Sequence, residues 1–105
     1  SKTIKSDQKR IIEFSNIKIN LNKLLILKND KEFKINNTEK IILEKMINNP
    51  GKIFSREDIG QLIKLHKERS IDVIITRLRK KIEIDPKNPK FLQTIRGAGY
   101  VLWIE

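Results

Sequence analysis

The first third of the chain contains short apolar clusters that recur with a period close to two. The clusters lie at 11–14, 17–19, 24–27 and 33–35 and are separated by Asn, Asp and Lys residues. Such alternation is typical of short antiparallel strands joined by tight turns. The cluster at 24–27 alone also fits a helical turn, but Asn29 and Asp30 follow too closely for a helix. The pattern predicts three or four strands between residues 11 and 35.

The spacing of apolar residues becomes helical at Asn36. Asn36 and Glu39 form a capping-box pattern, in which each side chain accepts a hydrogen bond from the other residue's backbone N–H. Apolar residues then recur at helical spacing as far as the Asn-Pro-Gly sequence at 49–51, which predicts the end of the helix. Ser55 and Asp58 repeat the capping pattern, so we expect a short second helix there.

A third helix is predicted over residues 70–84, where the Asp-Pro pair at 85–86 ends it. At 100° per residue, its apolar side chains form one narrow stripe of Ile71, Ile75, Leu78 and Ile82. The opposite side centres on Arg69, Val73, Thr76, Arg77 and Lys80. We therefore expect one face of this helix to be buried and the other to be cationic.

Residues 91–104 have the pattern of a β-hairpin. Two apolar segments, 91–95 and 100–104, flank a turn over Arg-Gly-Ala-Gly at 96–99. The order of elements predicts an α+β fold, a winged helix-turn-helix with an N-terminal antiparallel four-stranded sheet, three helices and a C-terminal β-hairpin wing. A length of 105 residues suits one domain, expected over 11–105 after a flexible leader or linker at 1–10.

The composition excludes several kinds of chemistry. The chain has no cysteine, which rules out disulfides, thiolate metal sites and cysteine nucleophiles. Its one histidine is His66. No clustered carboxylates accompany the histidine, so we expect no catalytic residues, no metal site and no cofactor. No apolar run is long enough to span a membrane, and no signal peptide is evident. We therefore expect a cytoplasmic protein and no enzyme.

The net charge of +10 becomes informative once its distribution is considered. The chain is rich in Ile, Lys and Asn, which is the bias of an AT-rich genome, so much of the lysine charge can be compositional. Arginine is scarcer, and four of the six arginines lie between 69 and 96. Residues 69–82 carry five basic side chains against Asp72 alone. This concentration favours nucleic acid or an acidic membrane surface as the partner.

The polar face of the third helix carries side chains suited to reading base edges in a major groove. Arg77 can pair with guanine through two hydrogen bonds, Asp72 can accept from the cytosine amino group, and Val73 can contact a thymine methyl. A solvated helix in which Asp72 favours the first turn, or pairs with a neighbouring arginine, is the alternative. The side chains expected at DNA phosphates, which set affinity rather than sequence, are Arg69, Ser70, Thr76, Arg79, Lys80 and Lys81.

Arg96 stands at the tip of the predicted hairpin, ahead of two glycines and an aromatic residue. A narrow turn with one arginine can enter a minor groove, where the negative potential is strong. An ordinary turn would explain the glycines through their positive φ, but it would not explain the arginine. Thr94, just before the tip, is a further candidate for a phosphate contact.

The stretches 69–82 and 93–102 resemble the C-terminal effector domain of OmpR/PhoB-type response regulators. Residues 49–58 and the Thr38-Glu39 pair also match, so the resemblance covers about 11–104. It implies a transcription factor that binds double-stranded DNA sequence-specifically, with the helix at 70–84 in the major groove and the wing at 94–100 in the minor groove. The contacts it implies are to bases from Asp72, Val73 and Arg77, to the backbone from Thr76, Arg79 and Thr94, and to the minor groove from Arg96.

The same resemblance implies partners and a mode of control. Two such domains usually bind head-to-tail on direct-repeat half-sites about one helical turn apart, so we expect a monomer in isolation and a dimer on DNA. A receiver domain is expected to precede Ser1 and to bring control by phosphorylation. The protein is then expected to be associated with the nucleoid in the cytoplasm.

Two positions depart from the family pattern. Ile74 stands where a histidine that can touch DNA is common. The loop at 64–68 is several residues shorter than usual and lacks the tryptophan that often precedes the segment contacting RNA polymerase. We therefore expect an altered polymerase contact, repression, or action through another surface. His66, inside this loop, is expected to be an exposed loop residue.

Two other binding functions are weighed against DNA binding. A membrane-surface module would need aromatic anchors on the apolar side of the basic helix, which carries only aliphatic residues. A protein-interaction domain stays open, because the lysine excess can be compositional. Substitution of Arg77 by glutamate separates a DNA-binding domain from a protein-interaction domain. It should abolish specific DNA binding and spare a protein contact made elsewhere.

Overall fold

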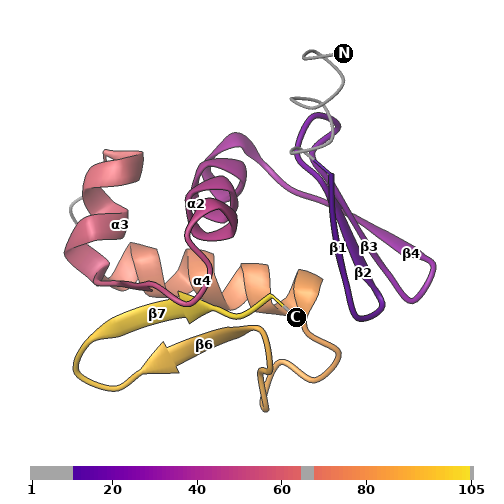
Figure 1. Cartoon of the computed structure of the whole chain (residues 1–105). Coiled ribbons are helices and arrows are strands. Elements are labelled where there is room, and N and C mark those ends of the chain that lie inside the picture. The colour runs from indigo at the N-terminus through magenta and orange to yellow at the C-terminus, as the bar shows by residue number, and fades with distance from the viewer. Residues whose placement is uncertain (1–10, 65–67, 105) are drawn as a thin grey trace.

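The computed structural model describes residues 11–64 and 68–104, arranged as Figure 1 shows. The predicted leader at 1–10 and the loop residues 65–67 lie outside the described residues. The N-terminal strands are β1 (Ile11–Phe14), β2 (Ile17–Asn20), β3 (Leu25–Lys28) and β4 (Lys31–Lys34). Then follow α2 (Asn37–Asn48), β5 (Ile53–Phe54), α3 (Arg56–Ile63), α4 (Glu68–Ile82), β6 (Leu92–Ile95) and β7 (Gly99–Leu102). This order confirms the predicted α+β winged fold.

Strands β1 to β4 form an antiparallel sheet in sequence order. Asn29 and Asp30 both have positive φ, 50° and 67°, as a tight hairpin turn between β3 and β4 requires. Ile19 and Ile26 lie opposite each other on the inner face and are fully buried. The segment 24–27 is therefore not a helical turn, since its last three residues belong to β3.

Both predicted capping boxes are present. The Asn36 side chain accepts a hydrogen bond from the N–H of Glu39 at 2.8 Å, and the Glu39 carboxylate accepts from the N–H of Asn36 at 2.9 Å. Ser55 and Asp58 make the equivalent pair of bonds at 3.0 and 3.2 Å. Each cap of this kind typically stabilises a helix by about 1 kcal/mol. They fix where α2 and α3 begin, as the sequence predicted.

Helix α4 is displaced by two residues at each end from the predicted span of 70–84. It begins at Glu68, because Glu and Arg ahead of Ser70 are better helix formers than Ser. It ends at Ile82, where Lys28 from β3 donates from Nζ to the carbonyl oxygens of Lys80 at 2.9 Å and Glu83 at 2.7 Å. A cation at the last carbonyls satisfies orphan acceptors and the negative end of the helix dipole.

The hairpin belongs to a three-stranded sheet with the order β5-β7-β6. The sequence pattern did not predict β5, whose two residues pair with Val101 and Tyr100 of β7. Two residues are too few to display a period of two. Because β5 lies between α2 and α3, this pairing attaches the wing to the helical part of the domain.

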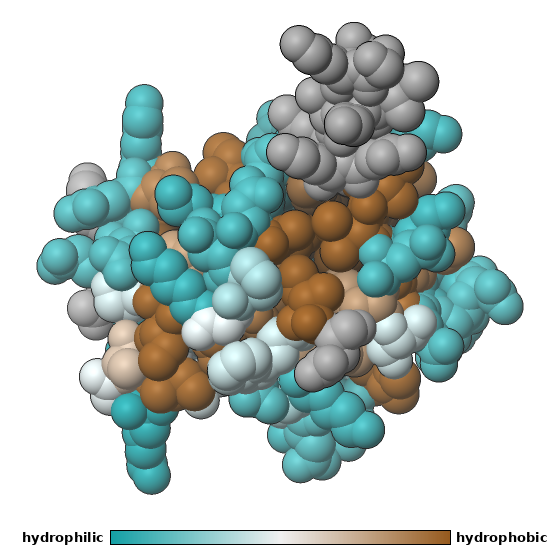
Figure 2. Space-filling model, viewed as in Figure 1, coloured by the Kyte–Doolittle hydropathy of each residue, from teal (hydrophilic) through white to brown (hydrophobic). Residues whose placement is uncertain are grey.

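One core joins all the parts. α4 runs between α2 and the hairpin, with the N-terminal sheet at its C-terminal end (Figure 1). The predicted stripe of α4 is buried, with Ile71, Ile75, Leu78 and Ile82 at 1% exposure or less. In the space-filling view, hydrophilic side chains project at the periphery and apolar surface shows between them (Figure 2). The buried stripe orients α4, so its opposite face is left to solvent.

Candidate nucleic-acid interface

The exposed face of α4 is the first component of the candidate interface. Its exposed members are Arg69, Val73, Thr76, Arg77 and Lys80. Val73 is 42% exposed, so its side chain is on the solvent side of α4, away from the buried stripe. The burial pattern confirms the two faces that the sequence predicted. Ser70, which the sequence predicted at the DNA backbone, is half-buried in the first turn of α4.

The arginines within residues 11–64 and 68–104 divide into two groups. Within the described residues, no hydrogen bond or ion pair holds the guanidinium of Arg69, Arg77 or Arg96. Arg56 and Arg79, in contrast, each bond to side chains or carbonyls of other elements. An unpaired guanidinium keeps all five of its N–H donors for a partner outside the fold. The three unpaired arginines are therefore available, together with the exposed Lys80, as cations of the interface.

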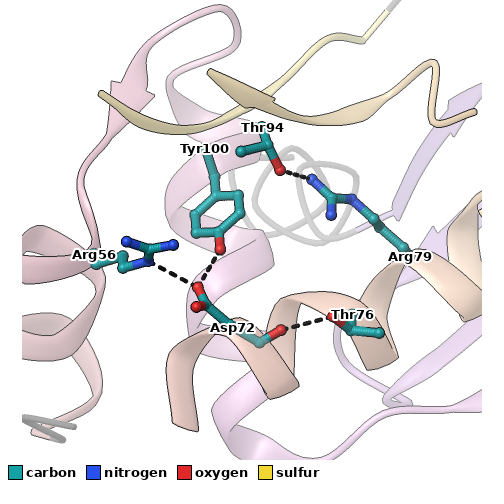
Figure 3. Close-up of polar contacts among 6 residues, drawn as sticks. All are labelled: Arg56, Asp72, Thr76, Arg79, Thr94 and Tyr100. Atoms are coloured by element: carbon teal, nitrogen blue, oxygen red, sulfur yellow. Dashed lines mark hydrogen bonds and ion pairs between the residues drawn. The ribbon is translucent and has the colours of Figure 1, made fainter. Parts of the chain in front are cut away.

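Arg79 and Thr94 were both expected at DNA phosphates, and the structure brings them together. Arg79 donates from Nε to the carbonyl oxygen of Leu92 at 2.8 Å and from a terminal nitrogen to the Thr94 hydroxyl oxygen (Figure 3). Its guanidinium carbon also lies 5.7 Å from the ring centroid of Tyr100. Arg79 thus ties α4 to both wing strands, and Thr94 keeps its own O–H available as a donor.

Two more of the expected backbone contacts are engaged inside the fold. Thr76 donates its hydroxyl proton to the carbonyl oxygen of Asp72 at 2.8 Å, one turn earlier in α4. Lys81 donates from Nζ to both carboxylate oxygens of Glu39, at 2.8 and 3.0 Å. Glu39 is 1% exposed, so Lys81 neutralises a buried carboxylate on α2. The structure thereby separates Lys81 from the exposed face that carries Lys80.

Asp72, expected to read a base, is paired with an arginine, as the alternative allowed, and the Tyr100 hydroxyl joins them in a polar cluster. Arg56 donates from Nε to Asp72 Oδ1 at 2.8 Å, and the Tyr100 hydroxyl donates to the same oxygen (Figure 3). Burial raises the pKa of Asp72, but the hydrogen bonds from Tyr100 and Arg56 lower it more, so the net pKa is depressed. Desolvation and the bond to Asp72 raise the pKa of Tyr100.

The wing turn is the second component of the interface. Arg96 is exposed at the tip, and Gly97 beside it has φ of +79°. Gly99 has φ of +146°, and a Cβ there would lie 2.1 Å from the carbonyl oxygen of Phe54. The wing therefore approaches the start of α3 as closely as glycine alone permits. Between them lies an open groove of about 360 Å³, lined in part by Arg56, Thr94 and Arg96.

Glu83 anchors the entry to the wing, and it was not among the functional residues that the sequence predicted. Its carboxylate is 1% exposed and accepts from the backbone N–H groups of Lys90, Phe91 and Leu92, at 2.8, 3.0 and 2.7 Å. A glutamate in a charged run after a helix is normally expected to be exposed to solvent. Its place one position after the last core isoleucine of α4 is the signal that could have marked it.

The remaining predictions concern Ile74, the short loop and metals. Ile74 is half-buried and packs against the core, so it contributes little to the exposed face of α4. His66 lies outside the described residues, as does most of the 64–68 loop. Among residues 11–64 and 68–104, no group of three or more His, Asp or Glu side chains could hold a metal ion. None of the described helices has the length and apolar content needed to cross a membrane.

Known proteins share both the sequence pattern and the fold. The family model for "Transcriptional regulatory protein, C terminal" matches residues 30–102. The probable transcriptional regulator ycf27 of Guillardia theta is 40% identical over 97 residues, covering 87% of this chain and 38% of that protein. The response regulator DrrB of Thermotoga maritima, an OmpR/PhoB homologue, matches with a TM-score of 0.80 at 27% identity, over 97% of this chain and 52% of that chain. The AdeR DNA-binding domain, solved in complex with an intercistronic region, matches with a TM-score of 0.69 at 27% identity, over 90% of this chain and 100% of that chain.

These similarities include the parts of the chain that carried the resemblance in the sequence. The matched region contains α3, α4 and the hairpin, and the likeness to DrrB extends over the N-terminal sheet as well. The chain spans less than half the length of the curated relatives it matches. The family consists of regulators and not of enzymes. The chain belongs to the family of C-terminal domains of transcriptional regulatory proteins, of the OmpR/PhoB type.

Proposed function

We propose that this domain binds double-stranded DNA sequence-specifically and serves as the output domain of a transcription regulator. One observation carries the proposal: the arginines on the exposed face of α4 and at the wing tip have no partner among the described residues, whereas Arg56 and Arg79 are held inside the fold. A polyanion supplies the missing partners. The AdeR domain, which shares this fold at 27% identity, was solved with DNA, and this supports the assignment.

In this arrangement α4 lies in the major groove and the wing turn at 94–100 in the adjacent minor groove. Arg77 pairs with a guanine edge and Val73 contacts a thymine methyl, while Arg96 enters the minor groove. Phosphates are contacted from Arg69, Ser70, Lys80 and the free O–H of Thr94. Thr76 contributes through its position on the exposed face, although its proton is directed to the Asp72 carbonyl.

Arg79 and Lys81 have internal partners, so their larger contribution is to the interface geometry. Arg79 holds the wing strands against α4, and Lys81 compensates the buried Glu39 carboxylate. Their remaining N–H groups supply a weaker phosphate attraction. Substitution of either residue should therefore reduce stability as well as affinity for every DNA sequence.

The test is selection of preferred duplexes from a random pool, followed by affinity measurements on the selected site. With about six phosphate contacts, the logarithm of affinity should fall against the logarithm of salt with a slope near −5. Arg77→Gln should weaken binding to the selected site about tenfold and relax the preference at one base pair. Lys18→Gln, the same charge change on the exposed sheet face, is the matched control. Equal affinity for selected and scrambled duplexes, or a slope near zero, would contradict the proposal.

The finer assignments extend this proposal through the family. Two copies bind head-to-tail on direct-repeat half-sites, so the domain is a monomer alone and a dimer on DNA. Sedimentation of the free chain, and of the chain on duplexes with one or two half-sites, tests this stoichiometry. A second bound copy that is insensitive to half-site spacing would argue against the head-to-tail arrangement.

The relatives are longer than this chain, which supports a regulator with a receiver domain and control by phosphorylation. Such a protein acts in the cytoplasm at the nucleoid. The remaining assignment is that the short 64–68 loop alters the contact with RNA polymerase, so that the protein represses or acts through another surface. A reporter assay in which a loop of the usual family length is grafted into the full-length regulator tests it. Unchanged activation after the graft would refute a role for the loop.

A further inference from the structure

The two carboxylate oxygens of Asp72 have different surroundings. Oδ1 accepts from both Arg56 Nε and the Tyr100 hydroxyl, and both dashed lines in Figure 3 end on this one oxygen. Oδ2 accepts no hydrogen bond from the described residues. The Asp72 side chain is 41% exposed, so the unused oxygen borders solvent at the first turns of α4. One oxygen is thus saturated by the fold, and the other is left as an acceptor.

The two donors come from different elements. Arg56 is the first residue of α3, and Tyr100 lies in β7 of the wing. An aspartate side chain has two rotatable bonds, and a single donor would leave it free to turn. Two donors that converge on Oδ1 from different elements restrict both rotations, which fixes the direction in which Oδ2 points. A preorganised acceptor loses less conformational entropy when a base arrives.

The positive charge of Arg56 also affects how the Asp72 carboxylate interacts with DNA. An unpaired carboxylate at a DNA surface is repelled by the phosphates, and this would weaken binding at every sequence. The ion pair with Arg56, 2.8 Å between Nε and Oδ1, offsets that repulsion locally. Because Arg56 is itself half-exposed, it also keeps N–H groups directed to solvent. The carboxylate can therefore lie against DNA without a net negative charge.

We propose that Arg56 and Tyr100 are positioning residues that hold Asp72 so that only Oδ2 faces the major groove and accepts from a cytosine amino group. This inference rests on the proposed function. It assigns specificity to a three-element cluster of α3, α4 and the wing rather than to α4 alone. Tyr100 and Arg56 touch no base in this scheme and act through Asp72.

The decisive variant is Asp72→Asn. Arg56 and Tyr100 are both donors, so the amide oxygen of the asparagine takes the Oδ1 position and its NH₂ group the Oδ2 position. The acceptor that faced the groove becomes a donor, while the anchoring contacts persist. The preferred base at one position should change from cytosine to a base with an acceptor in the major groove. A purely structural role for Asp72 leaves the preference unchanged.

The assay measures the affinity of the 105-residue chain for the selected duplex and for its three alternatives at that base pair. The original chain should prefer cytosine by about tenfold, and Asp72→Ala should reduce this ratio to about twofold or less. Tyr100→Phe, which removes only the hydroxyl, and Arg56→Gln should each lower the ratio about threefold. Lys18→Gln is the charge control for Arg56→Gln and should leave the ratio unchanged. Thermal unfolding verifies that each variant is folded.

Failure of this inference is distinguishable from failure of the proposed function. If the original chain selects a sequence but Tyr100→Phe and Arg56→Gln change affinity equally for all four bases, or not at all, the positioning role is refuted. An unaltered base preference in Asp72→Asn refutes it as well. If the original chain selects no sequence, the proposed function itself fails and this inference with it.

Discussion

Replacement of Glu83 by alanine tests whether the wing depends on a buried carboxylate. Glu83 accepts three backbone N–H groups at 2.7 to 3.0 Å from residues 90–92, where the chain enters β6. Alanine leaves these three donors without their acceptor, at a place that water reaches poorly, since Glu83 is 1% exposed. Each unsatisfied buried donor costs about 1–3 kcal/mol, and loss of the buried charge returns part of this.

The expected loss for Glu83→Ala is about 3–5 kcal/mol in the free energy of unfolding. Glu83→Gln should cost less, about 1–3 kcal/mol, because the amide oxygen can still accept from Phe91 and Leu92. Its NH₂ group then faces the N–H of Lys90, which has no acceptor left. We therefore expect the free energy of unfolding to rise from Glu83→Ala to Glu83→Gln to the original chain.

Urea unfolding followed by fluorescence provides the measurement, because Trp103 is the only tryptophan. Its backbone N–H donates to the carbonyl of Phe91 at 2.8 Å, and its indole N–H donates to Gln93 Oε1 of β6 at 3.0 Å. Trp103 thus reports on the wing itself, and far-ultraviolet circular dichroism reports on the helices. Glu13→Ala, on the exposed face of β1, is the control and should change stability by less than about 0.5 kcal/mol. A loss below about 1 kcal/mol for Glu83→Ala would refute the reasoning.

Three further predictions concern stability. Gly99→Ala should cost more than about 3 kcal/mol in urea unfolding, because its Cβ would meet a backbone oxygen at 2.1 Å; Gly97→Ala, with nothing within 4 Å, should cost only about 1–2 kcal/mol. Lys81→Met should cost about 1–3 kcal/mol because it leaves the carboxylate of Glu39 buried without its cation, and an unchanged midpoint would contradict that pairing. The pKa of Asp72 is depressed in the fold, so its contribution is complete above about pH 4 and lost as the pH falls below that value. Asp72→Asn should accordingly lose less stability than the original chain when pH-dependent unfolding is followed from about pH 5 to 3. Equal losses would exclude Asp72 as a source of the pH dependence of stability.

Local signals in the sequence were sufficient for most of the fold. The capping boxes at Asn36 and Ser55 are determined by residues three apart, and the stripe of α4 follows from helical geometry alone. β5 was missed because a two-residue strand exists only through its pairing with β7. Glu83 was missed for a related reason, since its carboxylate is explained by N–H groups seven to nine residues later.

The candidate interface shows the same limit more sharply. Arg77 and Arg79 are two residues apart in one basic run, and the sequence suggests a DNA contact for each. In the structure Arg77 has no partner among the described residues, whereas Arg79 is bonded to Leu92 and Thr94. Which arginine is free depends on where the wing packs, and residue type does not encode that. Asp72 is a similar case, because its pairing with Arg56 spans sixteen positions and two helices.

The anchors on the wing have a consequence for how DNA is recognised. Arg79 ties α4 to β6, the Tyr100 hydroxyl ties β7 to Asp72, and Glu83 holds the entry to the wing. These three contacts restrict movement of the hairpin relative to the helix beside it. In the proposed complex, the distance between a base contacted by α4 and the minor groove at Arg96 is therefore set by the protein. DNA whose groove geometry does not match that distance must deform, so its sequence-dependent stiffness contributes to specificity at base pairs that no side chain touches.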